Sequence, residues 1–204
     1  MSRPRWTAAE AAHAVAGRLA GGSDWAATGV TIDSRELQPG DLFVALTAER
    51  DGHDFAPEAM KRGAAAALVS RADACEGPRL VVDDVLDALR LLGEAARERA
   101  PALRVGVTGS VGKTSVKEAL AAVFREAGPA HWSVKSFNNH WGVPLTLARM
   151  PADTARAVFE MGMNHSGEIE GLTAQVRPHI ALITKIAPAH LENLGSMEAI
   201  ADAK

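Results

Sequence analysis

The residues best suited to chemistry form one octet, Thr-Gly-Ser-Val-Gly-Lys-Thr-Ser, at positions 108–115. The octet follows a β-branched run at 103–107 and precedes apolar residues at helical spacing over 116–127, so it is predicted to join a strand to a helix. Glycines there let backbone amides turn toward phosphate oxygens, and the helix start adds partial positive charge. The strict motif has glycine where this chain has Val107. An ordinary glycine turn is the alternative, which Gly-Lys-Thr in this context disfavours.

Different residues of the octet could contact different parts of a bound nucleotide. Lys113 can reach the β- and γ-phosphates, and the Thr114 hydroxyl can hold Mg²⁺. The predicted cofactors are therefore ATP and Mg²⁺. The predicted ATP-binding residues are Gly109, Ser110, Val111, Gly112, Lys113, Thr114 and Ser115.

Three further residues could take part in the same chemistry. Glu160 ends a predicted strand over 156–160, which is where a second metal ligand belongs; a solvated strand-end acid is the alternative. His190 follows a predicted strand over 180–186, and a histidine alone there is more typical of a surface. Lys204 lies on a predicted helix opened by Ser196, where a lysine is normally solvated.

Two adjacent amides, Asn138 and Asn139, lie in a polar loop over 137–144 that contains glycine and proline. Amides in such a loop can contact a substrate, so both are predicted substrate-binding residues. The alternative is that they only make turns, which is the usual role of asparagine in loops.

The elements that must position these residues alternate between strands and helices, which predicts an α/β fold. Residues 1–101 and 102–204 are predicted to be two domains, because Ala100-Pro101-Ala102 interrupts the pattern. In the second domain we expect a mainly parallel sheet around the phosphate loop. The predicted elements there include a strand over 133–137, a helix near Leu145 and a helix over 168–176. This domain supplies fewer strands than a phosphate-loop sheet normally has, so we expect it to be truncated.

Composition narrows the class of protein. A net charge of −3 over 204 residues leaves no basic footprint, so no nucleic-acid partner is predicted. The single Cys75 excludes an internal disulfide framework and suits a reducing compartment. The apolar runs are too short for a membrane span, and the N-terminus does not resemble a signal peptide. We therefore expect a cytoplasmic protein without membrane insertion.

Taken together, these motifs resemble the Mur ligase family. In the second domain the resemblance is carried by the octet, by 138–144, by Glu160-Met161-Gly162-Met163-Asn164-His165, by Arg177-Pro178, and by 190–191 with 195–204. In the first domain it is carried by Thr31-Ile32-Asp33-Ser34-Arg35, by 39–46 and by Asp51-Gly52-His53-Asp54-Phe55.

The resemblance implies an ATP-dependent ligase that joins D-alanyl-D-alanine to UDP-N-acetylmuramoyl-tripeptide through an acyl phosphate, and that is a monomer when full length. It implies a substrate domain over 1–101 and an ATP-binding central domain over 102–204. Lys113, His190 and Lys204 would be catalytic, Lys204 after carbamylation, and Thr114, Glu160 and His190 would hold metal. Ser34 and Arg35 would contact the uridine nucleotide, since a guanidinium fork suits a diphosphate.

Two other functions remain open. One is a different amide ligase of the same superfamily, which the first domain and the Asn138-Asn139 loop disfavour. The other is a non-catalytic module that binds a nucleotide sugar and turns nothing over.

Overall fold

The computed structural model describes residues 4–189 and 191–204, and the chain divides into two compact units, 1–95 and 96–204. The predicted boundary at 101/102 lies six residues later than this division. The difference arises at the end of helix α3 (Val85–Arg99), where Arg97 is buried and its guanidinium donates to the carbonyls of Ala174 and Gln175. These contacts tie the last turn of α3 to the second unit.

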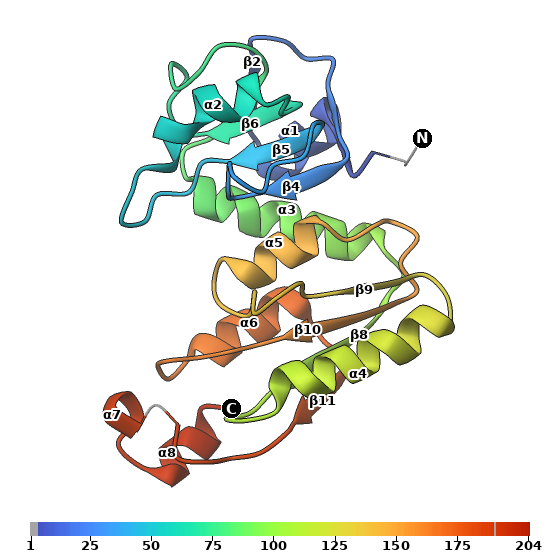
Figure 1. Ribbon diagram of the computed structural model, residues 1–204, viewed down its shortest axis with the longest axis vertical. Coiled ribbons are helices and arrows are strands. Elements are labelled where there is room, and N and C mark those ends of the chain that lie inside the picture. The colour runs from blue at the N-terminus through green and yellow to red at the C-terminus, as the bar shows by residue number, and fades with distance from the viewer. Residues whose placement is uncertain (1–3, 190) are drawn as a thin grey trace. The chain divides into compact units, whose positions relative to one another are not determined.

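The main sheet of the first unit has the strand order β2-β7-β6-β5-β4 (Figure 1), parallel except for β2. A small antiparallel ribbon of β1 and β3 accompanies it. The strands are β1 (Trp6–Thr7), β2 (Arg18–Ala20), β3 (Ala26–Ala27), β4 (Gly29–Thr31), β5 (Asp41–Val44), β6 (Ala66–Val69) and β7 (Arg79–Val81). The helices are α1 (Ala8–Val15), the 3₁₀-helix η1 (Gly52–Phe55), α2 (Ala56–Lys61) and most of α3.

Helix α1 begins with a capping box formed by Thr7 and Glu10. The Thr7 hydroxyl accepts from the backbone amide of Glu10, and the Glu10 carboxylate accepts from the amide of Thr7 at 2.9 Å. The helix ends at Val15, because Ala16 takes a left-handed conformation at φ 49°. The chain then enters β2, which pairs with β7.

A buried histidine fastens η1 to the end of β6. His53 is 4% exposed, its Nδ1 lies 2.6 Å from the Asp51 carboxylate, and its Nε2 accepts from the backbone amide of Ser70. The contacts with His53 hold the pKa of Asp51 at about 2, well below its usual value. Asp51 is therefore a charged anchor of this corner at neutral pH.

The sheet of the second unit is parallel, with the order β11-β8-β10-β9. Its strands are β8 (Leu103–Thr108), β9 (Ala130–Trp132), β10 (Arg156–Glu160) and β11 (Ile180–Ile183). Its helices are α4 (Lys113–Glu126), α5 (Gly142–Ala148), α6 (Glu168–Val176), α7 (Leu191–Leu194) and α8 (Met197–Asp202). The mainly parallel α/β fold predicted for this part of the chain is confirmed.

Helices cover both faces of this sheet (Figure 1), as a parallel sheet requires. Helix α4 packs on the face formed by Val105, Val107 and Val158, while α5 and α6 pack on the opposite face against Ala157 and Phe159. The carboxyl ends of β8, β10 and β11 meet at one edge, because Val107 lies beside Glu160 and Thr108 beside Ile183. Ligands of open α/β sheets bind at this edge.

Candidate functional site

The octet forms a glycine loop between β8 and α4, the strand–loop–helix context that the sequence predicts. Gly109 and Gly112 have φ angles of 138° and 89°, which side chains rarely allow. A Cβ atom at Gly109 would lie 2.1 Å from the Thr184 hydroxyl. The glycines are therefore required by the shape of the loop.

Thr184, which follows β11, holds this loop in place and was not found from the sequence. Its hydroxyl lies 2.6 Å from the carbonyl of Val111 and 3.2 Å from the carbonyl of Thr108. The next residue, Lys185, accepts from the amide of Ser110 at 2.7 Å. The end of β11 thus fixes the loop backbone before any ligand arrives.

Two hydroxyls in the loop are suited to a polar ligand. Among the described residues, the side-chain oxygens of Thr108 and Ser110 are buried and have no hydrogen-bond partner. Leaving such groups unsatisfied is unfavourable, and buried polar groups normally find a partner. Together with the two glycines of the loop, these hydroxyls fit the phosphate groups of a nucleotide.

Lys113 and Lys204 lie near one another in the structure. The Lys113 ammonium donates to the carbonyl of Gly109 at 2.8 Å. Burial lowers the pKa of Lys204, and the positive charge of Lys113 lowers it further. Lys204 follows the end of α8, which the Ser196 hydroxyl caps as predicted. The fold thus brings Lys204 to the loop, although its catalytic role remains a prediction.

Glu160 is the buried carboxylate of the site, only 1% exposed. Its Oε2 accepts from the Thr114 hydroxyl at 2.9 Å, and its Oε1 accepts from the Asn138 side-chain amide at 2.8 Å. The structure therefore unites Thr114 and Glu160, two of the three predicted metal ligands. The third, His190, lies outside the described residues.

A hydroxyl and one carboxylate suit Mg²⁺, which commonly takes one or two carboxylates and completes its ligands with water and phosphate. Over residues 4–189 and 191–204, no group of three or more histidine, cysteine, aspartate or glutamate side chains could hold a metal. The Thr114–Glu160 pair is thus a partial site, of the kind that a bound nucleotide would complete. Metal binding here remains a prediction.

The two adjacent amides have different places. Asn138 contacts Glu160, whereas the Asn139 side-chain oxygen accepts from the backbone amides of Trp141 and Gly142 at the start of α5. Both contacts are structural, and substrate binding by either residue remains a prediction. The predicted strand over 133–137 is wrong, since β9 ends at Trp132 and the following residues form a loop.

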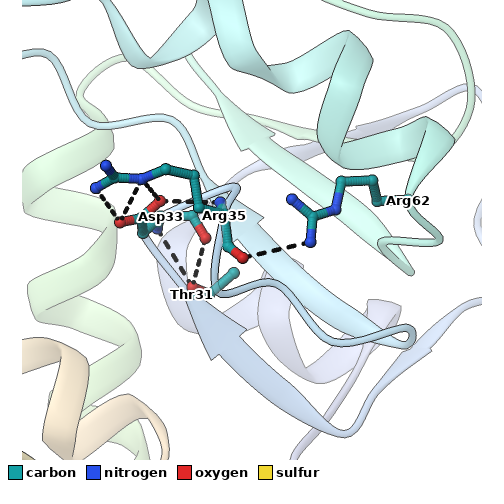
Figure 2. Close-up of polar contacts among 4 residues, drawn as sticks. All are labelled: Thr31, Asp33, Arg35 and Arg62. Atoms are coloured by element: carbon teal, nitrogen blue, oxygen red, sulfur yellow. Dashed lines mark hydrogen bonds and ion pairs between the residues drawn. The ribbon is translucent and has the colours of Figure 1, made fainter.

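The candidate substrate residues of the first unit lie in the turn after β4 (Figure 2). The Arg35 guanidinium pairs with the carboxylate of Asp33 at 2.7 Å, and Asp33 accepts the backbone amide of Arg35 as well. Thr31 is buried, and its hydroxyl contacts the backbone of Asp33. Arg62, at the end of α2, donates from its guanidinium to the Arg35 carbonyl at 3.3 Å.

Arg35 itself is exposed, with 86% of its side chain accessible, while Ser34 is half-buried in the same turn. The contact with Asp33 raises the pKa of Arg35, so the guanidinium is always charged. This arrangement presents a cation at the surface near the carboxyl end of β4. Contact of Ser34 and Arg35 with a uridine nucleotide remains a prediction.

No helix in the part of the chain that the structure describes is both long enough and apolar enough to cross a membrane.

Comparison with known proteins gives matches along most of the chain. The family model for the Mur ligase family, catalytic domain, matches residues 26–126, and that for the Mur ligase middle domain matches residues 107–204.

Among the curated relatives are several named UDP-N-acetylmuramoyl-tripeptide–D-alanyl-D-alanine ligase. The Escherichia coli (strain K12) protein is 45% identical over 90% of this chain and 41% of its own length. The Bacillus subtilis (strain 168) protein is 42% identical over 86% of this chain and 39% of its own length. The chain spans about two fifths of the length of these relatives.

Solved structures show the same fold. A crystal structure of MurF from Acinetobacter baumannii superposes with a TM-score of 0.87 at 34% identity, covering 99% of this chain and 45% of that chain. The MurF ligase from Thermotoga maritima in complex with ADP gives a TM-score of 0.68 at 31% identity, covering 86% of this chain and 41% of that chain.

Proposed function

This chain belongs to the Mur ligase family, and from that membership we propose that it serves the ATP-dependent addition of D-alanyl-D-alanine to UDP-N-acetylmuramoyl-tripeptide. The observation that carries the proposal is the glycine loop whose Thr114 contacts the buried Glu160 at 2.9 Å. The E. coli ligase that is 45% identical and the ADP complex of the T. maritima ligase support the same assignment.

The chemistry to be catalysed is amide formation from a carboxylate, whose oxygen is a poor leaving group at neutral pH. ATP with Mg²⁺ would supply a phosphoryl group that converts the carboxylate into an acyl phosphate and releases ADP. The amine of D-alanyl-D-alanine would then attack the acyl carbon, forming the amide and releasing inorganic phosphate. Amide and hydroxyl groups of the loop orient phosphate oxygens, and the loop is already held by Thr184. Little reorganisation is then needed when the nucleotide binds.

Lys113, Thr114 and Glu160 have distinct roles in this proposal. Lys113 exchanges the Gly109 carbonyl for a phosphate oxygen and stabilises negative charge. Thr114 and Glu160 would hold Mg²⁺, and Asn138 keeps Glu160 oriented. Because Glu160 is buried, its charge acts with little screening by water.

Lys204 has the environment that carbamylation needs. A lysine reacts with CO₂ only as the neutral amine, and the lowered pKa of Lys204 increases that fraction. The product is an anion that would lie beside Lys113 and could face Mg²⁺. His190 is proposed as a second metal ligand on the resemblance alone.

In the first unit we assign the nucleotide-sugar substrate to the turn that contains Ser34 and Arg35. Its exposed guanidinium suits the diphosphate, which accepts paired hydrogen bonds from a planar fork. We also propose a cytoplasmic location, because ATP and nucleotide-linked sugars are cytoplasmic metabolites and Cys75 is a free thiol.

Calorimetric titration of the chain with Mg·ATP and, separately, with UDP-N-acetylmuramoyl-tripeptide tests the two sites. Both ligands are expected to bind, each without the other. A chimera that continues residues 1–204 with the remaining three fifths of the E. coli relative tests the reaction. Sustained ADP release should require both the tripeptide and D-alanyl-D-alanine, because the acyl phosphate forms without the dipeptide but is consumed by it; sustained release that does not depend on the dipeptide would refute the proposed reaction.

A further inference from the structure

Lys117 is a buried cation outside the phosphate loop, on the second turn of α4. Its side chain is 0% exposed. The ammonium donates to the carbonyl of Ser133 at 2.9 Å and to that of Lys135 at 3.1 Å, and it pairs with Glu118 at 2.7 Å. An ammonium has three donors and tolerates burial only when they are satisfied. These acceptors fix where Lys117 and the loop after β9 must lie.

The same loop carries Asn138 to Glu160. Between Lys117's acceptors and Asn138 the chain makes a tight turn, in which the amide of Asn138 donates to the carbonyl of Ser136 at 2.8 Å. Lys135 adopts a φ of 54°, a left-handed conformation that is unfavourable for a side chain other than glycine or asparagine. Its carbonyl is one of those that Lys117 holds, so the ammonium stabilises the turn in this conformation.

These contacts close a ring around the predicted metal site. Thr114 and Lys117 are three residues apart on α4 and therefore lie on one side of the helix. Thr114 contacts one oxygen of Glu160, while Lys117 holds the loop whose Asn138 contacts the other oxygen. The Ser133 hydroxyl also accepts from the amide of Glu160 at 3.2 Å. Both ends of the ring begin on the helix that follows the phosphate loop.

We propose that Lys117 is a positioning residue for the metal site: it holds the loop over 133–138 so that Asn138 orients Glu160 toward the nucleotide-bound cation. The metal in this inference rests on the proposed function. The effect of Lys117 on the loop over 133–138 does not depend on that function. Without the ammonium, two loop carbonyls lose their buried donor, the left-handed turn relaxes and Asn138 leaves Glu160.

Lys117→Met, whose unbranched side chain is one atom shorter and carries no charge, tests this inference on the 204-residue chain. Without ligand, amide hydrogen exchange over 133–139 should become at least about tenfold faster. With the ATP analogue AMP-PNP, Mn²⁺ affinity measured by electron paramagnetic resonance should fall about tenfold. Glu118→Gln is the matched control, since it leaves both carbonyl contacts of Lys117, and it should match wild type in both measurements.

A double-mutant cycle separates positioning from a general loss of stability. If Lys117 acts through Asn138, adding Lys117→Met to Asn138→Ala should cause no further loss of Mn²⁺ affinity. Additive losses, or a folded Lys117→Met with wild-type exchange and Mn²⁺ affinity, would overturn the inference.

If Lys117→Met does not fold, Lys117→Arg replaces it. The planar guanidinium cannot reproduce the contacts of the Lys117 ammonium, so Mn²⁺ affinity should still fall. Wild-type Mn²⁺ affinity in Lys117→Arg would refute the role of Lys117. Absence of Mn²⁺ binding by wild type would instead refute the proposed nucleotide site. Hydrogen exchange would still test whether Lys117 holds the loop over 133–138.

Discussion

The two units present their charged groups in different ways, although both do so at the carboxyl end of a parallel strand. In the second unit, Glu160 is 1% exposed and is held by Thr114 from a helix and by Asn138 from a loop. In the first unit, Arg35 is 86% exposed and its guanidinium pairs with Asp33, two residues away. Glu160 is thus held by contacts with distant segments, whereas the Arg35 guanidinium contacts a residue of its own turn.

This difference bears on how each site would bind its ligand. The buried site is organised in advance, since Thr184 and Glu160 are fixed by neighbouring strands. A ligand there meets groups that are already desolvated, and losing one is costly. Arg35 must exchange an internal partner for an external one in water, where ion pairs contribute little. Substitutions in the second unit should therefore have the larger effects on binding.

The largest effect is expected from Lys113→Ala, which removes the cation of the glycine loop. Charge-assisted hydrogen bonds contribute about 1.5–3 kcal/mol, so affinity for Mg·ATP should fall roughly 10- to 100-fold. Binding of UDP-N-acetylmuramoyl-tripeptide should stay unchanged, because its proposed site lies in the other unit. Calorimetry with both ligands measures this, and unchanged nucleotide affinity would remove Lys113 from the site.

A smaller effect is expected from Glu160→Gln, which keeps the shape of the side chain but removes its charge and replaces one acceptor oxygen by a donor. The Mg²⁺ concentration needed for half-maximal nucleotide binding should rise about tenfold, because a neutral amide is a poor ligand for a hard cation. Glu168→Gln is a control at an exposed carboxylate, and it should leave the Mg²⁺ titration unaltered. Superimposable titrations of Glu160→Gln and wild type would show that Glu160 does not bind metal.

The sequence predicted well those elements whose pattern is strong and local. Strand β10 and helix α6 have the predicted bounds, because their apolar patterns and clear end signals define them. The predicted strand over 133–137 failed for a tertiary reason. Its carbonyls are taken by the ammonium of Lys117, and Lys135 is held in a left-handed conformation that no strand contains.

The candidate site was predictable to the extent that its residues belong to contiguous motifs. Thr114 and Glu160 follow from a loop motif and a strand end, and the structure joins them. Thr184 and Lys117 carry no signal of their own, since a threonine after a strand and a lysine on a helix are ordinary. Their roles emerge only from the order β11-β8-β10 and from the phase of α4.

A polar contact at the start of η1 in the first unit should respond to acid. Asp51 has a pKa of about 2 in the fold against a usual value of 3.8, through its contacts with His53. A lowered pKa contributes stability above pH 3.8, and this contribution is lost as pH falls toward 2. Asp51→Asn should therefore lower stability at neutral pH and flatten its dependence on pH in that range. Urea denaturation from pH 7 to pH 2.5 measures both, and equal slopes for variant and wild type would contradict the assignment.

The smallest effect is expected from Arg35→Ala. An exposed ion pair contributes about 0–1 kcal/mol, so affinity for UDP-N-acetylmuramoyl-tripeptide should fall at most about fivefold, while Mg·ATP binding stays constant. Arg35→Lys should recover only part of this loss, because an ammonium lacks the fork that matches a diphosphate.

Asp33→Asn provides the sharper contrast. It removes the internal competitor for the guanidinium, so binding should hold or improve slightly provided that the turn persists. The affinities are measured by calorimetry at low and at physiological salt, since an exposed contact should weaken with salt. A loss of 100-fold or more in Arg35→Ala would mean that this turn closes on its ligand and becomes as buried as the site around Glu160.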